Sequence, residues 1–179
     1  MPVLHVVPFY CGTATDLIDG LEERLARVFG VRVEHHPPSF EPEVAYDASR
    51  GQYNSRILLA QLLRQAPADD SRVLGVTALD LFIPVLTYVF GEAQVNGKAA
   101  VVSSHRLDNA LYGLPASHEL LFERLCKEAI HELGHTYNLV HCHNAECVMT
   151  SSMQIDGVDL KSDRFCSRCK AALRHNGVS

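Results

Sequence analysis

Three histidines and one glutamate lie close together between residues 131 and 141. His131 and His135 are four residues apart, which on a helix gives about 6 Å of rise and only about 40° of rotation. Both imidazoles then leave the same face, as two Zn–N bonds of about 2.0 Å require. Glu132 lies beside the metal without binding it and can take a proton from zinc-bound water. The spacing therefore predicts a catalytic type of zinc site.

His141, six residues beyond His135, is the expected third ligand. A continued helix would carry it about 9 Å along the axis and about 240° around, away from the metal, so the helix must end between the two. Asn138 is the expected break, because asparagine accepts the left-handed conformation that closes a helix. His143 is a rival third ligand. Three neutral histidines leave a fourth position for water, whose pKa zinc lowers to roughly 7, and this water is the expected nucleophile.

Four cysteines follow with the two-plus-two spacing of a structural tetrathiolate zinc site. They are Cys142, Cys147, Cys166 and Cys169. Four thiolates close the coordination sphere, so this metal should do no chemistry and should instead fold a small subdomain. The alternative of disulfides needs an oxidising compartment, which nothing in the sequence indicates. We therefore expect two zinc ions per chain, coupled where Cys142 follows His141.

The other histidines and cysteines show no such pattern. Cys11 and Cys126 are expected to be small buried hydrophobic residues. Six histidines have no ligand spacing to one another, so we expect solvated or hydrogen-bonded side chains. These are His5, His35, His36, His105, His118 and His175.

The composition is that of a globular chain of one domain. Of 179 residues, 47% are hydrophobic and 21% charged, and the formal net charge is −5. The acidic balance disfavours nucleic acid as a partner. The N-terminus does not resemble a signal peptide, and no apolar run approaches the roughly 18 residues of a membrane span. We expect a cytoplasmic monomer without a membrane partner.

The elements that must position these residues alternate along the chain. Apolar runs predict strands over residues 4–9, 31–34, 72–78, 88–94 and 99–104, the last two joined as a hairpin through Asn96 and Gly97. Helical periodicity predicts helices over 17–28, 54–65, 117–138 and 163–174, with Gly30 and Ser117 as caps. Residues 37–51 and 80–84 are expected to be loops. The first strand, helix and strand form a βαβ unit on a partly parallel sheet.

The pattern from residue 131 to residue 169 resembles the archaemetzincins, a family of the metzincin clan of zinc metallopeptidases. The motif of that family is HExxHxxGxxH-C-x4-C-x-M, followed by CxxC. The corresponding residues here are His131, Glu132, His135, Asn138, His141, Cys142, Cys147, Met149, Cys166 and Cys169. Asn138 departs from the usual glycine. About forty residues carry the resemblance, which is far more specific than the short zincin motif.

The resemblance implies an α/β (α+β) fold of the metzincin-like zincin type. It has a twisted mixed sheet with two main helices over residues 1–138, and a small zinc-stapled C-terminal subdomain over 139–179, together forming one catalytic domain. Three histidines would bind the catalytic zinc, Glu132 would be general base and acid, and Met149 would supply the methionine turn beneath the metal. A sheet edge, residues 99–104, would hold an extended peptide by strand addition.

The function that follows is hydrolysis of peptide bonds in a peptide or protein substrate. The alternative is a catalytically silent, zinc-stabilised module that binds peptides or proteins. A third hypothesis, nucleic-acid binding by the cysteine module, conflicts with the acidic charge.

Overall fold

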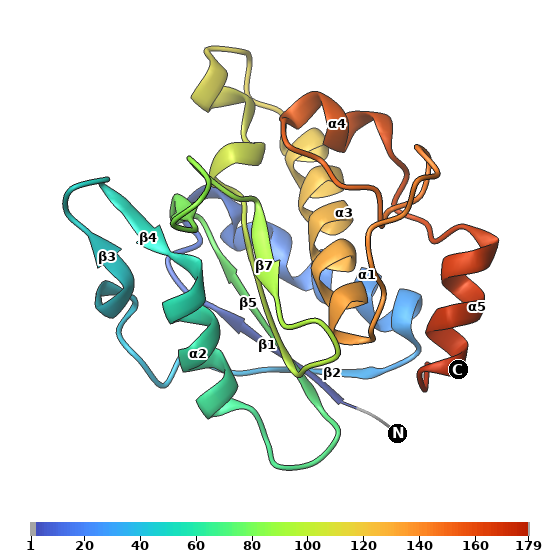
Figure 1. Cartoon of the computed structure of the whole chain (residues 1–179). Helices are drawn as coiled ribbons and strands as arrows, with labels where there is room; N and C mark the ends of the chain where they lie inside the picture. The colour runs from blue at the N-terminus through green and yellow to red at the C-terminus, as the bar shows by residue number, and fades with distance from the viewer. Residues whose placement is uncertain (1–2, 179) are drawn as a thin grey trace.

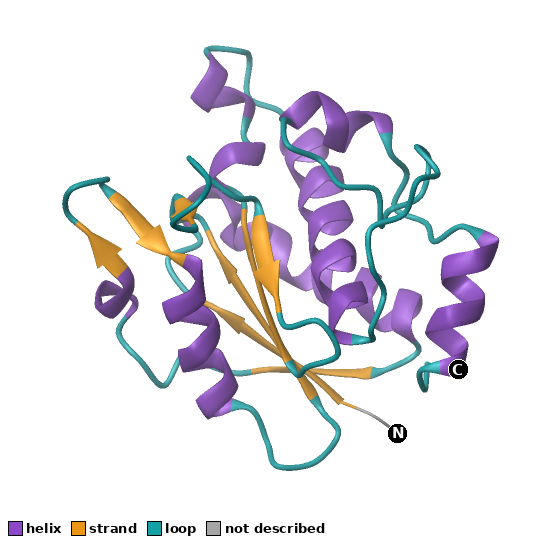
Figure 2. Ribbon diagram, in the orientation of Figure 1, coloured by secondary structure: helices purple, strands orange, loops and turns teal. Residues whose placement is uncertain are grey.

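A five-stranded sheet crosses the centre of the molecule (Figures 1 and 2). The computed structural model describes residues 3–178, and within them the strand order is β2-β1-β5-β8-β7. The first four strands pair in parallel, and β7 is antiparallel to β8. The bounds are β1 Val3–Pro8, β2 Arg32–His35, β5 Arg72–Thr77, β7 Gly91–Ala93 and β8 Ala99–Ser103.

A second sheet of three very short strands lies beside the first. It consists of β3 Tyr46–Asp47, β4 Gln52–Asn54 and β6 Leu81–Phe82, with β3 antiparallel and β6 parallel to β4. The expectation of loops throughout 37–51 and 80–84 is therefore wrong in part. Strands of two or three residues are too short to produce a recognisable alternation of polar and apolar side chains.

Helices cover both faces of the large sheet. Helices α1 (Ile18–Phe29) and α3 (His118–Thr136) lie together on one face, and α2 (Ser55–Gln65) lies on the other (Figure 1). The C-terminal part adds α4 (Ile155–Leu160), which the sequence did not predict, and α5 (Ser167–His175). Short 3-10 helices complete the described structure: η1 Gly12–Leu17, η2 Pro42–Ala45, η3 His105–Leu107 and η4 Asn109–Tyr112.

Capping residues explain where the main helices begin and end. Gly30 closes α1 in the left-handed conformation, at φ 61°. The side chain of Asn54 accepts a hydrogen bond from the backbone N–H of Arg56 at the start of α2. That of Ser117 accepts one from the N–H of Leu120 at the start of α3. The predicted caps at Gly30 and Ser117 are confirmed.

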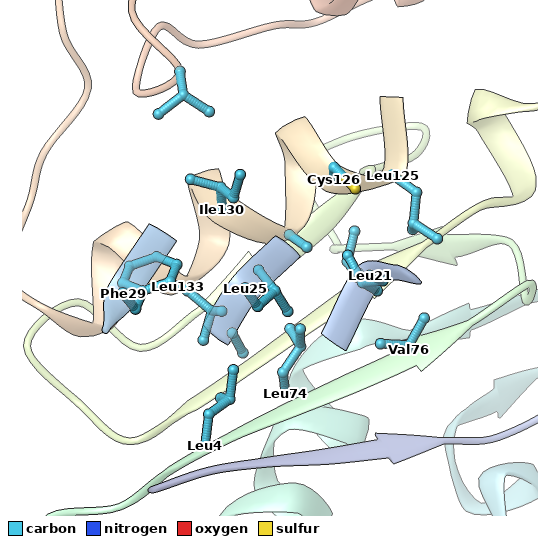
Figure 3. Packing of buried hydrophobic residues seen from close by; sticks show 14 of the residues in the cluster. Leu4, Leu21, Leu25, Phe29, Leu74, Val76, Leu125, Cys126, Ile130 and Leu133 are labelled. Atoms are coloured by element: carbon cyan, nitrogen blue, oxygen red, sulfur yellow. The ribbon is translucent and has the colours of Figure 1, made fainter. Parts of the chain in front are cut away.

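The main core fills the space between the sheet and the pair α1 and α3 (Figure 3). Its labelled side chains come from the sheet (Leu4, Leu74, Val76), from α1 (Leu21, Leu25, Phe29) and from α3 (Leu125, Cys126, Ile130, Leu133). Fully burying one such leucine or isoleucine contributes roughly 1.5–3 kcal/mol. This packing fixes the height and rotation of α3, the helix that carries His131.

The predicted hairpin is present, but its strands differ from the expectation. Strand β7 covers only Gly91–Ala93 of the predicted residues 88–94, and Asn96 in the turn has φ 55°. Residues 99–104 do not form an edge of the sheet, because β8 pairs with β5 on one side and β7 on the other. That prediction is wrong, and the edge strand at this end is β7.

The C-terminal part shares its core with the rest of the chain. The cluster that includes Leu4 and Leu133 also contains Cys142, Val148 and Leu173. A division at residue 138 thus stays a prediction, and any boundary there runs through a continuous apolar cluster. Among the described residues, no helix is both long and apolar enough to cross a membrane.

Candidate metal centres

The imidazole rings of His131, His135 and His141 converge at the C-terminal end of α3. Their ring centroids are 4.8 Å apart for His131 and His135, 5.3 Å for His131 and His141, and 5.0 Å for His135 and His141. One nitrogen from each ring lies within 4.8 Å of the others. His143, the rival ligand, does not belong to this group in the described structure.

The turn that brings His141 back is built on Asn138. Helix α3 ends at Thr136, and Asn138 has φ 63°, the left-handed conformation predicted for it. The backbone N–H of Leu139 then donates to the carbonyl oxygen of Gly134 over 3.1 Å, which satisfies one of the last carbonyls of the helix. The expected break is confirmed.

Two backbone carbonyls orient the helical histidines. Nδ1 of His131 lies 2.8 Å from the carbonyl oxygen of Val148, and Nδ1 of His135 lies 2.8 Å from that of Leu139. Because a carbonyl only accepts, each Nδ1 carries the proton and each Nε2 carries a lone pair. Burial lowers the pKa of both rings, which favours their neutral forms.

The two Nε2 atoms lie 3.2 Å apart. Two lone pairs at that distance repel each other unless a cation lies between them. Neutral imidazoles held by carbonyls through their second nitrogen are the usual surroundings of zinc in proteins. The residues present therefore fit a zinc ion.

The carboxyl group of Glu132 is buried beside this centre, with 7% of the residue exposed. Burial raises its pKa well above the ordinary value, and the nearby carboxylate of Glu128 raises it further. Gly91 of the edge strand β7 lies against it: a Cβ there would be 2.7 Å from Cγ of Glu132. The missing side chain of Gly91 thus leaves room for the carboxyl group between α3 and β7.

A cavity of about 180 Å³ opens onto Glu132 and the histidines. It is lined by Leu86, Tyr88, Val89, Phe90, Gly91, Glu128, His131, Glu132, His141, Ser151, Ser152 and Met153. Its walls come from the segment around β7, from α3 and from the segment after Met149. A water molecule or a peptide carbonyl placed there would meet Glu132 and two of the three histidines.

Gly134 is a site residue that the sequence analysis missed. Met149 is fully buried against α3, and a Cβ at Gly134 would lie 2.5 Å from its Sδ and 3.2 Å from its Cε. A glycine inside a helix costs about 1 kcal/mol relative to alanine, and this cost was the available signal. Gly134 lets the methionine approach the helix between His131 and His135.

A buried ion pair behind the histidines was also missed. Nζ of Lys161 lies 2.8 Å from Oε1 of Glu128, and both side chains are almost completely buried. The same Nζ donates to the carbonyl oxygen of Thr150, next to Met149. The pair ties the end of α4 to α3 and to the methionine segment. No sequence spacing signals it, because the two residues lie on different elements.

The four predicted cysteine ligands also come together. Their sulfur atoms lie within 4.8 Å of one another, and all six described cysteines are free thiols. The 3.8 Å between the Sγ atoms of Cys142 and Cys166 matches the edge of about 3.8 Å of a tetrahedron with Zn–S bonds of about 2.3 Å. A backbone N–H from Asn144 lowers the pKa of Cys142 to about 7, which favours the thiolate. This cluster fits a closed zinc site.

The cysteines outside the cluster are buried as expected. Cys126 lies between α3 and α1, and burial raises the pKa of its thiol to about 12. Burial also raises the pKa of Cys11, whose Sγ lies 3.3 Å from the carbonyl oxygen of Val76. Both behave as small apolar side chains.

Comparison with known proteins agrees with this geometry. The model of peptidase family M54 matches residues 24–175. The archaemetzincin of Methanocaldococcus jannaschii is 42% identical over 163 residues, which cover 91% of this chain and 88% of that protein. The archaemetzincin of Methanopyrus kandleri is also 42% identical over 163 residues, 90% of this chain and 89% of that protein.

Two crystal structures share the whole fold. The archaemetzincin structure from Methanopyrus kandleri has a TM-score of 0.85 and 40% identity, and covers 98% of this chain and 94% of that one. A zinc-dependent peptidase from Methanocorpusculum labreanum has a TM-score of 0.85 and 30% identity, and covers 95% of this chain and 99% of that one. The chain therefore belongs to peptidase family M54, the archaemetzincins, and is a zinc metallopeptidase.

Proposed function

We propose that His131, His135 and His141 bind the catalytic zinc and that Glu132 is the general base and acid of peptide hydrolysis. The main support is that the Nε2 atoms of His131 and His135 lie 3.2 Å apart, with the buried carboxyl group of Glu132 on the same helix. Met149 supports the centre from below, as in the methionine turn of metzincins.

When bound, zinc polarises the peptide carbonyl and lowers the pKa of water at the site. Glu132 takes the proton of the attacking water and then passes it to the amine that leaves. Burial raises the pKa of Glu132, and a carboxylate whose conjugate acid is weaker is a stronger base. The carbonyls of Val148 and Leu139 keep the two helical histidines in the orientation that the metal requires.

An extended peptide substrate is proposed to pair with β7, in place of the segment 99–104 expected from the sequence. Strand β7 ends the large sheet and lies beside Glu132 through Gly91. Strand addition there would lay the peptide backbone along the cavity and bring one carbonyl to the metal. Met153 and Tyr88 on the cavity wall would contact the side chains of that peptide.

The proposal includes a second, structural zinc ion on the four cysteines, hence two per chain. We further propose one catalytic domain with two subdomains, residues 1–138 and 139–179. We also propose that the protein is a cytoplasmic monomer without nucleic-acid or membrane partners. The net charge of −5 supports the exclusion of nucleic acid.

The test is the substitution Glu132→Gln. It preserves size but cannot accept a proton, so cleavage of a peptide library by zinc-loaded protein should fall by about 10²–10⁴-fold. The zinc content, measured by elemental analysis, should stay unchanged, because Glu132 is not a ligand.

The matched control is Glu119→Gln, an exposed change at the N-terminal end of the same helix. It should cleave the library at the wild-type rate. Wild-type turnover by Glu132→Gln would exclude this residue as the general base.

A further inference from the structure

A third group of metal-binding side chains lies on the large sheet, away from the two centres described above. It consists of His5 on β1, with Glu34 and His36 at the end of β2. One ligand atom of each residue lies within 4.8 Å of the others, the same limit that the catalytic histidines satisfy. His5 and His36 have no ligand spacing in the sequence, and it is the pairing of two strands that brings their side chains together.

Strand pairing brings the three side chains together. His5 is the register partner of Glu34 in the parallel pair β1 and β2. His36 lies two residues beyond Glu34, so both side chains point to the same face. The backbone N–H of His36 donates to the carbonyl oxygen of Val6 over 2.9 Å, which extends the pairing past the end of β2. The backbone positions of all three residues are thus fixed by the sheet.

This face is opposite to the one that carries the catalytic helix. Leu4 and Val6, the neighbours of His5 along β1, pack in the core with α1 and α3. Since side chains alternate along a strand, His5 points to the other face of the sheet. The group is therefore independent of both zinc centres.

Glu34 is oriented toward the two imidazoles. Its Oε2 lies 3.4 Å from Nε2 of His36 and 3.8 Å from Nδ1 of His5. Its other oxygen, Oε1, lies 2.7 Å from Nη2 of Arg32, which leaves Oε2 for the histidines. Two tetrahedral zinc ligands with bonds of about 2.0 Å are about 3.3 Å apart, so small rotations of these side chains suffice to bind an ion.

Nε2 of His36 supplies an independent observation. This atom is buried, although 41% of the whole side chain is exposed, and its 3.4 Å contact with Oε2 of Glu34 is not a hydrogen bond. Buried polar atoms are normally paired, and an unpaired one needs a partner. Two imidazoles and one carboxylate are the donor set of zinc and of other divalent transition metals.

We infer that His5, Glu34 and His36 form a further binding site for a divalent transition-metal ion of the zinc class. The ion links β1 to β2, the strand at the other end of the sheet from β7. Three protein ligands leave coordination positions for water. Bound metal should hold the edge strand in place and stabilise the folded chain.

The experiment compares zinc content between variants, so it does not depend on how many ions the other centres hold. Wild type, Glu34→Gln and His36→Asn are equilibrated at a series of fixed free zinc concentrations, and the bound zinc is measured by elemental analysis. Wild type should bind one ion more per chain than either variant. In isothermal titration, both variants should lose affinity for this ion by at least about tenfold.

His35→Asn is the matched control. His35 is the neighbouring histidine on β2, its side chain is exposed, and its Nδ1 contacts Glu22 on α1. This variant should bind as much zinc as wild type. Circular dichroism and peptide cleavage should be the same in all four proteins, which shows that they fold. Equal zinc contents in wild type, Glu34→Gln and His36→Asn would overturn the proposed site, as would loss of the additional ion in His35→Asn.

Discussion

The proposed catalytic centre depends on single atoms that are present or missing at particular residues. Gly134 has no Cβ, and Met149 occupies the space that this atom would fill. The tautomers of His131 and His135 depend in the same way on two carbonyl oxygens, those of Val148 and Leu139. These small features decide whether two nitrogen lone pairs converge on a metal.

Because Gly134 contacts Met149, the effect of Gly134→Ala on the free energy of unfolding should change sign when Met149 is replaced. In the wild-type background, Gly134→Ala should lower the free energy of unfolding by about 1–3 kcal/mol, because the new Cβ overpacks against Sδ. Met149→Ala removes the obstacle. In the Met149→Ala background, Gly134→Ala should raise the free energy of unfolding by up to about 1 kcal/mol, because alanine has the higher helix propensity.

Urea unfolding at one fixed free zinc concentration measures the free energy of unfolding of wild type, the two single variants and the double variant. Destabilisation by Gly134→Ala of similar size in both backgrounds would show that Met149 is not what the Cβ meets.

The position of His141, the proposed third ligand, depends on how α3 ends. On a continuous helix, His141 would lie about 9 Å along the axis and about 240° around from His135. The turn at Asn138 brings it back to the other histidines. A left-handed residue other than glycine or asparagine costs roughly 1–2 kcal/mol. Asn138 can therefore adopt the left-handed conformation at the position where the family motif has glycine.

Two substitutions at Asn138 should separate backbone conformation from side-chain chemistry. Asn138→Gly keeps access to positive φ and should leave the zinc content unchanged, with the free energy of unfolding within about 1 kcal/mol of wild type. Asn138→Ala should lower the free energy of unfolding by about 1–2 kcal/mol and weaken the binding of the catalytic zinc.

Chemical denaturation and competition with a chelator measure the two effects. If Asn138→Ala bound zinc as tightly as Asn138→Gly, the left-handed turn would not be what positions His141.

The whole molecule folds around a core to which both ends of the chain contribute. Phe29 of α1 stacks on Tyr137 at 5.5 Å and meets Phe165 edge-on at 5.9 Å. Phe165 precedes the cysteine ligand Cys166, and Cys169 itself is buried in the same cluster. The cysteine centre is therefore coupled to the main core by direct packing.

Metal removal should reveal this coupling. Mild chelation should remove the zinc of the histidine centre and that of the site on His5, Glu34 and His36, because both have open coordination positions. It should leave the folded chain with the ion of the four cysteines. The zinc of the four cysteines should leave only with unfolding. Elemental analysis before and after chelation measures both.

Cys169→Ser should lower the melting temperature of the entire chain in one transition, because the cluster spans residues on both sides of position 138. Calorimetry with a matched Cys126→Ala variant, which keeps the zinc ligands, provides the comparison. Two separate transitions in Cys169→Ser would mean that the C-terminal part unfolds independently.

Local spacing was enough to predict that the three histidines come together and that the four cysteines do. His131 and His135 lie on one helix face, Asn138 is a turn residue close by, and the four cysteines repeat a known ligand spacing. Such patterns can be recognised in the sequence because the residues that form each of them lie within one helix, one turn or one short segment. The main helices and the strands of the large sheet were predictable for the same reason.

Contacts between distant segments were decided only by the tertiary structure. The pairing of His5 with Glu34, the approach of Gly91 to Glu132 and the ion pair of Lys161 with Glu128 each join separate elements. The order of the strands belongs to the same class, and it placed β7 at the edge where residues 99–104 had been expected. Periodicity tells which face of an element is buried, but the partner of that face follows from packing, which no single segment encodes.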